Sequence, residues 1–158
     1  MSADAPELGY ARLADADAIS LLSRDSVEHG LPWTYRADRI ARYVRDPDAV
    51  VLIARMDRQL AGFAIMQFGD ERAHLVLMAV APAFRRRGVG RRMLAWLDES
   101  AQVAGVMSIH VELRARNHAA HALYRAAGFA ESLRIPGYYR GRETAVRMLR
   151  LLRAPHVA

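Results

Sequence analysis

An arginine- and glycine-rich segment in the middle of the chain has the residue types of a phosphate-binding turn. It reads Arg85, Arg86, Arg87, Gly88, Val89, Gly90 and Arg91, between an apolar run and a helical pattern. A helix that begins there leaves backbone N–H groups unpaired, and its dipole favours an anion. Gly88 and Gly90 let the backbone approach a ligand, and the arginines add charge-assisted contacts to phosphate oxygens. The alternative is an ordinary glycine turn with solvated arginines, but the position between strand and helix favours a small anionic ligand.

Asn117 and Tyr124 are seven residues apart, which is two turns of the helix expected over 117–127. Both side chains therefore lie on one face of that helix and can serve one ligand. The alternatives are that Asn117 only caps the helix and that Tyr124 only fills the core.

Two titratable residues, Glu112 and His74, lie on the strands expected on either side of the turn and its helix. The strand over 108–113 alternates, so His110, Glu112 and Arg114 share its polar face. Glu112 is either a functional carboxylate or a solvated residue paired with His110 or Arg114. His74 begins the preceding apolar strand, where a lone histidine is usually structural.

Aromatic residues occupy two of the expected loops. Trp33 and Tyr35 lie between the first two helices, and Tyr138 and Tyr139 lie in the loop over 136–142. Exposed aromatics on loops often mark recognition, although any single one more commonly fills a gap in the core.

The composition excludes several classes of function. The 158 residues include 23 basic ones, all arginine, with a net charge of +6 and neither cysteine nor lysine. No thiolate zinc site, cysteine nucleophile, Schiff-base lysine or Walker-type phosphate loop is therefore available. His29, His118 and His121 have no clustered carboxylates beside them, so we predict no metal. The arginines are spread along the chain without interleaved aromatics, which argues against nucleic acid as a partner.

Length and hydropathy predict one compact domain over residues 1–158. No linker, repeat or low-complexity segment divides the chain. No apolar run approaches the roughly 20 residues of a membrane span, and residues 1–11 lack a secretory pattern. We therefore expect a cytoplasmic protein without a membrane partner.

Hydrophobic periodicity predicts strands alternating with helices. The expected strands cover 10–13, 50–54, 60–68, 74–80, 108–113, 129–135 and 144–152, and the expected helices cover 15–30, 37–45, 88–105 and 117–127. The three strands between 50 and 80 form an antiparallel meander. The strand, helix and strand from 74 to 113 form a crossover, whose strands should run parallel. The expected fold class is α+β, with a mixed and mostly antiparallel sheet.

The half of the chain from about 74 to 139 resembles the GCN5-related N-acetyltransferases, the GNAT family. Their signature is Gln or Arg, two residues, Gly, one residue, then Gly or Ala, and Arg85, Gly88 and Gly90 satisfy it. The resemblance also runs through 77–82, 111–117, 122–124 and 128–129. Within the family, this half is most similar to the ribosomal-protein N-terminal alanine acetyltransferases.

The resemblance implies a GNAT-like fold, in which acetyl-CoA fills a V-shaped splay between the fourth and fifth strands and about four helices flank the sheet. Met78, Ala79 and Val80 would pair with the pantetheine arm, often beside a bulge. The amides of 86–91 would hold the pyrophosphate. An N–H group released near Val80 would stabilise the oxyanion that forms during transfer.

The resemblance also implies catalytic roles. The family's residue at the place of Tyr124 protonates the departing CoA thiolate, and the one at the place of Asn117 contacts the pantetheine. Glu112 matches the proposed base of the alanine acetyltransferases, because an amine is mostly ammonium at neutral pH and must lose a proton. His74 stands where histone-directed members carry their catalytic glutamate, so it is the second choice. The two aromatic loops would line the acceptor groove.

The expected activity is direct transfer of an acetyl group from acetyl-CoA to a primary amine in a ternary complex. The acceptor is a protein N-terminus or a small-molecule amine, and the enzyme is a monomer or a homodimer. A domain that binds acyl-CoA without turnover is an alternative, but it would not need Glu112 and Tyr124 at the family spacing. A nucleic-acid-binding module is the alternative that the positive charge suggests.

Overall fold

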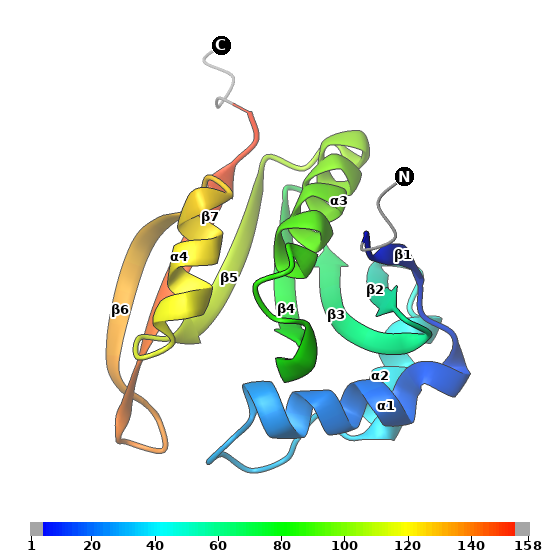
Figure 1. Ribbon diagram of the computed structural model, residues 1–158. Coiled ribbons are helices and arrows are strands. Elements are labelled where there is room, and N and C mark those ends of the chain that lie inside the picture. The colour runs from blue at the N-terminus through cyan, green and yellow to red at the C-terminus, as the bar shows by residue number, and fades with distance from the viewer. Residues whose placement is uncertain (1–4, 154–158) are drawn as a thin grey trace.

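The computed structural model describes residues 5–153 and arranges their strands in a single mixed sheet. The ends of the predicted domain, 1–4 and 154–158, lie outside the described residues. Within these, seven strands stand in the order β1-β2-β3-β4-β5-β7-β6 (Figure 1). The strands are β1 (Glu7–Tyr10), β2 (Ala49–Met56), β3 (Gln59–Phe68), β4 (Arg72–Val80), β5 (Ser108–Arg114), β6 (Ala130–Tyr139) and β7 (Glu143–Leu151). Only β4 and β5 pair in parallel, as the crossover predicts.

Helices cover both faces of the sheet. The α-helices of the described residues are α1 (Ala16–Leu22), α2 (Ala37–Arg45), α3 (Val89–Ala104) and α4 (His118–Ala126). Met93 and Leu97 of α3 are buried in the core on one face, and Ile19 of α1 and Ile40 of α2 in the core on the other (Figure 1). The expected α+β fold is confirmed. None of these helices is long and apolar enough to cross a membrane.

The first elements differ from the prediction. β1 ends at Tyr10, where the predicted strand begins. The Arg12 N–H donates a hydrogen bond to Asp15 Oδ2 (2.7 Å), and the chain turns into a short 3-10 helix over Leu13–Asp15. The single helix expected after it is α1 followed by a π-helical turn over Ser23–Val27. Local hydrogen bonds of this kind set such boundaries, and hydrophobic periodicity does not reveal them.

β4 and β5 pair along only part of their length. Their register joins Arg72 to Ser108 and ends where Leu75 meets Val111. Beyond this point the two strands diverge (Figure 1), while β4 stays paired with β3 as far as Val80. The splay expected between the fourth and fifth strands is therefore present, and it leaves one edge of β4 without a neighbouring strand.

A β-bulge in β4 lies where the splay begins. Met66 of β3 pairs with Leu75, but the preceding Ile65 pairs with Leu77, so Val76 is an extra residue on β4. Leu75 and Leu77 consequently pack in the cores on opposite faces of the sheet, although they are two residues apart. The bulge therefore rotates the second half of β4 relative to the first.

The β6–β7 hairpin differs from the prediction as well. β6 continues to Tyr139, which pairs with Glu143 of β7, so the prediction that Tyr138 and Tyr139 lie in a loop is wrong. Pro136 has no N–H to donate, and Gly137 adopts a φ of 68°. These two residues make the ladder irregular without ending the strand.

Candidate active site

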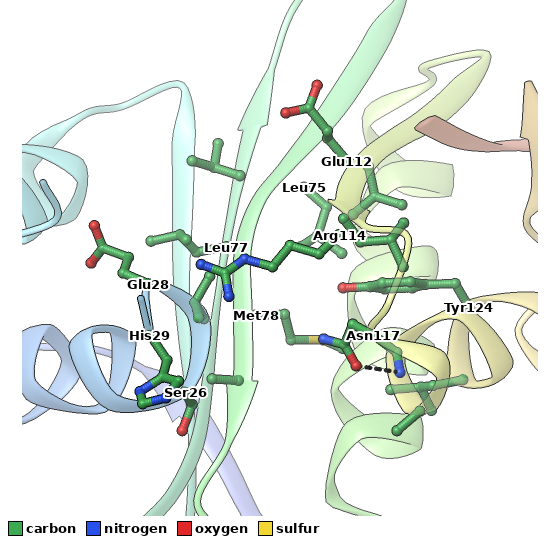
Figure 2. Close-up of a pocket in the computed structure, with 18 of the residues that line it drawn as sticks. Ser26, Glu28, His29, Leu75, Leu77, Met78, Glu112, Arg114, Asn117 and Tyr124 are labelled. Atoms are coloured by element: carbon green, nitrogen blue, oxygen red, sulfur yellow. Dashed lines mark hydrogen bonds between the residues drawn. The ribbon is translucent and has the colours of Figure 1, made fainter. Parts of the chain in front are cut away.

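One large open cleft occupies the splay between β4 and β5. Its walls come from these strands, the turn before α3, α4, the segment between α1 and α2, and the β6–β7 hairpin. Figure 2 shows β4 at the centre, Tyr124 and Asn117 on one side, and Ser26, Glu28 and His29 on the other. Because α4 and the segment between α1 and α2 lie on opposite faces of the sheet, the cleft is open to both faces.

The turn before α3 presents its backbone to this cleft. Arg86 (φ 61°) and Gly88 (φ 80°) both adopt left-handed conformations, and Gly88 is the N-cap residue of α3. A Cβ atom on Gly88 would meet no atom within 4 Å, so the space beside it is open. The unpaired amides of the first helical turn and the helix dipole favour an anion there. Gly90 serves packing instead, because its Cβ would lie 2.8 Å from Leu123 Cδ2 of α4.

The arginines of this turn differ in their contacts. Arg85 Nε donates a hydrogen bond to the Val80 carbonyl (3.2 Å), which ties the turn to β4. The Arg87 guanidinium lies 5.5 Å from the centre of the Phe84 ring, and Arg87 does not line the cleft. Apart from Arg87, all the predicted residues of the turn line the cleft, namely Arg85, Arg86, Gly88, Val89, Gly90 and Arg91.

The free edge of β4 continues the same wall. Met78, Ala79 and Val80 line the cleft beyond Leu75, where the pairing with β5 ends. An extended chain with amide groups can add to such an edge as a further strand. An anion-binding helix start beside a free strand edge fits the phosphates and the pantetheine amides of acetyl-CoA.

Tyr124 of α4 projects its hydroxyl into the cleft (Figure 2). The side chain is 5% exposed, and its ring lies 5.5 Å from that of Phe129. Burial raises the pKa of the Tyr124 phenol, because it disfavours the charged phenolate. Tyr124 is therefore a protonated hydrogen-bond donor at neutral pH.

Asn117 lies on the same wall and caps α4. Its Oδ1 accepts a hydrogen bond from the Ala120 N–H (3.1 Å), as the capping interpretation requires. Asn117 and Met78 of β4 both line the cleft. Because capping uses only Oδ1, the amide nitrogen remains a donor that a ligand in the splay can use.

Glu112 of β5 lines the cleft and is held by residues of the hairpin. Its Oε2 accepts a hydrogen bond from Arg147 Nε of β7 (3.1 Å). Glu112 therefore pairs across the sheet, and not with His110 or Arg114. Burial and the Glu112 carboxylate raise the pKa of Tyr139.

His74 lies near Glu112 in the same cleft. It pairs in register with His110, which shares a face of β5 with Glu112. Burial lowers the pKa of His74, because it disfavours the charged imidazolium, and the Glu112 carboxylate acts in the opposite direction. The two candidate bases are thus neighbours. No group of three or more His, Cys, Asp or Glu suited to a metal ion is present among residues 5–153.

Three of the four predicted aromatic residues line the cleft, namely Tyr35, Tyr138 and Tyr139. Trp33 does not. Its ring lies 4.5 Å from the Arg36 guanidinium and 5.3 Å from that of Arg24, and its indole N–H donates to the Ser20 carbonyl (3.2 Å). Trp33 therefore supports the segment that carries Tyr35 into the cleft.

Glu28 is a lining residue that the sequence did not single out. It is 6% exposed, and its Oε1 accepts hydrogen bonds from the Thr34 N–H (2.7 Å), the Thr34 hydroxyl (2.8 Å) and the Tyr35 N–H (3.2 Å). Its Oε2 accepts one from the Ser23 hydroxyl (3.0 Å). This buried carboxylate holds the segment between α1 and α2 in place. No sequence signal marks it, because a glutamate in a helical pattern is normally solvated.

Comparison with known proteins agrees with this geometry. Residues 16–129 match the model of the acetyltransferase (GNAT) family. The ribosomal protein bS18-alanine N-acetyltransferase of Salmonella typhimurium (strain LT2) is 36% identical over 126 residues, which are 76% of this chain and 81% of that protein. The protein of the same name from Escherichia coli K12 is 34% identical over the same shares.

Solved structures show the same relationship. The crystal structure of the ribosomal-protein-S18-alanine N-acetyltransferase from Escherichia coli matches with a TM-score of 0.82 at 27% identity, over 97% of this chain and 99% of that one. The fold of yncA from Salmonella typhimurium, solved with its cofactor acetyl-CoA, matches with a TM-score of 0.81 at 20% identity, over 97% and 96%. By sequence and by fold, the chain belongs to the GNAT family of acetyltransferases, and its reaction is the transfer of an acetyl group from acetyl-CoA to an amine.

Proposed function

We propose that this enzyme acetylates the N-terminal amine of a protein while both substrates occupy the cleft. The observation that carries the proposal is the opening of the cleft to both faces of the sheet. On one face, α4 and the turn that precedes α3 supply a site for acetyl-CoA. Tyr35, Tyr139 and Glu112 offer polar groups to an acceptor that enters from the other. The two substrates then meet at the splay, and the acetyl group passes directly between them.

The acetyl-CoA site would comprise the turn and the free edge of β4. The amides of 86–91 hold the pyrophosphate, with Arg86 and Arg91 as charge-assisted donors. Met78, Ala79 and Val80 pair with the pantetheine arm, and Asn117 donates to it from α4. Arg85 and Arg87 instead stabilise the turn, because they contact Val80 and Phe84.

Glu112 would remove the proton from the acceptor's ammonium group, directly or through a water molecule. Arg147 holds the carboxylate at the acceptor's side of β5. The free amine then attacks the thioester carbonyl, whose oxygen gains negative charge that a backbone N–H near Val80 stabilises. His74 is the second choice as the base.

Tyr124 would assist the leaving group on the opposite side of the splay. When the carbon–sulfur bond breaks, the sulfur leaves as a thiolate, and the Tyr124 hydroxyl donates a proton or a hydrogen bond to it. The raised pKa keeps this proton in place until the thiolate forms. The products are CoA and an amide at the acceptor's N-terminus.

The relatives support a protein acceptor. The proteins from Salmonella typhimurium and Escherichia coli are named for the alanine of ribosomal protein bS18. An acceptor of that kind is made in the cytoplasm, which is where we propose that this enzyme works.

Release of free thiol from acetyl-CoA tests the choice of acceptor. We expect short peptides that begin with a free alanine to give a higher kcat/KM than polyamines or aminoglycosides. The same peptides with a blocked N-terminus serve as the control and should be silent. The reverse ranking, with small amines ahead of every peptide, would identify a small-molecule acetyltransferase instead.

A further inference from the structure

The guanidinium group of Arg114 lies in the cleft with donors that are not used. Its Nε and Nη2 atoms are buried, and neither has a hydrogen-bond partner among residues 5–153. Figure 2 shows the side chain reaching from β5 across the cleft toward Leu77 of β4. Leaving the N–H groups of a cation buried without a partner is costly. The position of Arg114 therefore suits a ligand whose oxygen atoms can accept hydrogen bonds from the guanidinium group.

The charge of Arg114 is only partly balanced by the protein. Its Nε lies 3.4 Å from Glu143 Oε2, but the other oxygen of Glu143 lies 2.9 Å from Arg116 Nη1. One carboxylate thus serves two guanidinium groups. Glu112 does not supply the missing charge, because it pairs with Arg147 at 3.1 Å.

The rest of this wall, which we call the acceptor wall, is also positive. It consists of the cleft-lining charged residues of β5, of the segment that follows it and of the β6–β7 hairpin, which are Arg114, Arg116, Arg140, Arg142, Arg147, Glu112 and Glu143. Five arginines thus face two carboxylates. Arg140 and Arg142 are exposed, and their side chains have no partner within the described residues.

The carboxylates across the cleft do not neutralise the acceptor wall. Glu28 uses both oxygens within its own segment, and Figure 2 shows its carboxylate turned away from Arg114. Asp25 pairs with Arg24 at 2.9 Å. The excess of positive charge is therefore available to the acceptor.

We propose that the acceptor wall selects protein N-termini with an acidic side chain at the second position, and that Arg114 binds this carboxylate. The proposal rests on the proposed function, because it assumes a peptide acceptor. A carboxylate is the partner that fits best, because its two oxygens match the parallel N–H groups of a guanidinium.

Strand geometry places the acidic residue at the second position. Glu112 and Arg114 share a face of β5 and are two residues apart, so their Cα atoms are separated by about 7 Å along the strand. In an extended peptide, the carboxylate of a second-residue aspartate or glutamate also lies about 7 Å from the α-amine. We therefore infer that, with the amine at Glu112, the second residue is the one whose carboxylate comes within reach of the Arg114 side chain.

Three peptides that differ only at the second residue test the proposal. They begin Ala-Glu, Ala-Gln and Ala-Lys, and kcat/KM is measured for each at saturating acetyl-CoA. We expect the order Glu, Gln, Lys, with roughly tenfold or more between the first and last, as charge pairing in a half-buried site supplies. The small anionic amine 2-aminoethylphosphonate is included as a fourth acceptor.

Variants then show whether Arg114 is responsible. Arg114→Gln should lower kcat/KM for the Ala-Glu peptide by a clearly larger factor than for the Ala-Gln peptide, so that the preference between the two peptides is lost. Arg114→Lys, which keeps the charge, should retain part of the preference. Arg142→Glu, at an exposed turn, tests the acceptor wall without disturbing a buried site. Arg125→Gln is the matched control, because Arg125 is exposed on α4 and does not line the cleft.

The outcomes separate this proposal from the proposed function. Equal rates for the three peptides in the wild type would overturn the acidic preference and leave the peptide acceptor intact. An equal loss on all peptides in Arg114→Gln would also overturn it, because Arg114 would then act on a feature that all acceptors share. Silence with every peptide, together with turnover of 2-aminoethylphosphonate, would overturn both proposals. Acetyl-CoA binding by calorimetry shows that each variant is folded.

Discussion

At the scale of single residues, Tyr124 is protonated because it is buried. An exposed tyrosine has a pKa near 10, and burial raises the pKa of Tyr124 further. Such a phenol is a weak acid, so in the proposed mechanism it would assist a thiolate whose own pKa is about that of cysteine, near 8.5, without being essential. Because burial raises this pKa, deprotonation of Tyr124 should not lower the activity at any pH below about 10.

Replacing Tyr124 with phenylalanine removes only the hydroxyl. We expect Tyr124→Phe to lower kcat by roughly 10²–10³-fold, in line with general-acid contributions, and to leave acetyl-CoA affinity nearly intact. Steady-state kinetics and calorimetry measure the two quantities. Tyr10→Phe is the control, because Tyr10 is 69% exposed and lies outside the cleft. An unchanged kcat would assign Tyr124 to the core.

Glu112 and His74 are neighbouring candidates for the base, and His74 departs from an ordinary imidazole because its pKa is lowered. An imidazole with an ordinary pKa near 6.5 would lose its basic form at pH 6. The pKa of His74 is lowered, so its neutral form persists to lower pH. A fall in rate between pH 7 and pH 6 would therefore not by itself identify His74 as the base, and substitutions must decide.

We expect Glu112→Gln to lower kcat by roughly 10²-fold or more, because glutamine cannot accept the ammonium proton. His74→Gln should cost less than about tenfold in the same assay. Both are measured with a peptide acceptor at saturating acetyl-CoA across the pH range. A near-normal Glu112→Gln with a large loss in His74→Gln would reverse the assignment.

At the scale of elements, the start of α3 should decide cofactor binding. Gly88 and Gly105 stand at opposite ends of this helix with φ values of 80° and 81°, and a Cβ at either would meet nothing within 4 Å. Asparagine tolerates such a conformation better than other residues do. We therefore expect Gly88→Asn to weaken acetyl-CoA binding at least tenfold by filling the anion site. Gly105→Asn, the matched control, should bind acetyl-CoA normally. Equal acetyl-CoA affinities of the two variants by calorimetry would contradict an anion site at Gly88.

The elements also show which features a sequence can predict. α2 has the predicted limits, and Gly105 ends α3 where expected, because periodicity and a left-handed glycine mark helices. The bulge at Val76 has no such mark, since valine is an ordinary strand residue. Its effect arises only from the pairing of β4 with β3 and β5. The resemblance to the family, and not periodicity, predicted the splay.

At the scale of the whole molecule, the candidate site depends on contacts between distant segments. The sequence predicted that the turn at 85–91 and Tyr124 belong to the site, because both carry local patterns, and most of these residues line the cleft. It missed the buried Glu28 and the unpaired donors of Arg114, because the surroundings of both come from other elements. It placed Trp33 in the acceptor groove, but Trp33 packs behind it. A monomer or a homodimer remains a prediction.

The position of the acetyl group on the product shows directly which amine the enzyme acetylates. A peptide with a free N-terminal alanine and an internal lysine is incubated with the enzyme and acetyl-CoA, and the product is sequenced by tandem mass spectrometry. If the acceptor is a protein N-terminus, the product carries one acetyl group on the α-amine of the alanine and none on the lysine. Acetylation of the lysine with a free α-amine, or no peptide product while small amines are acetylated, would contradict it.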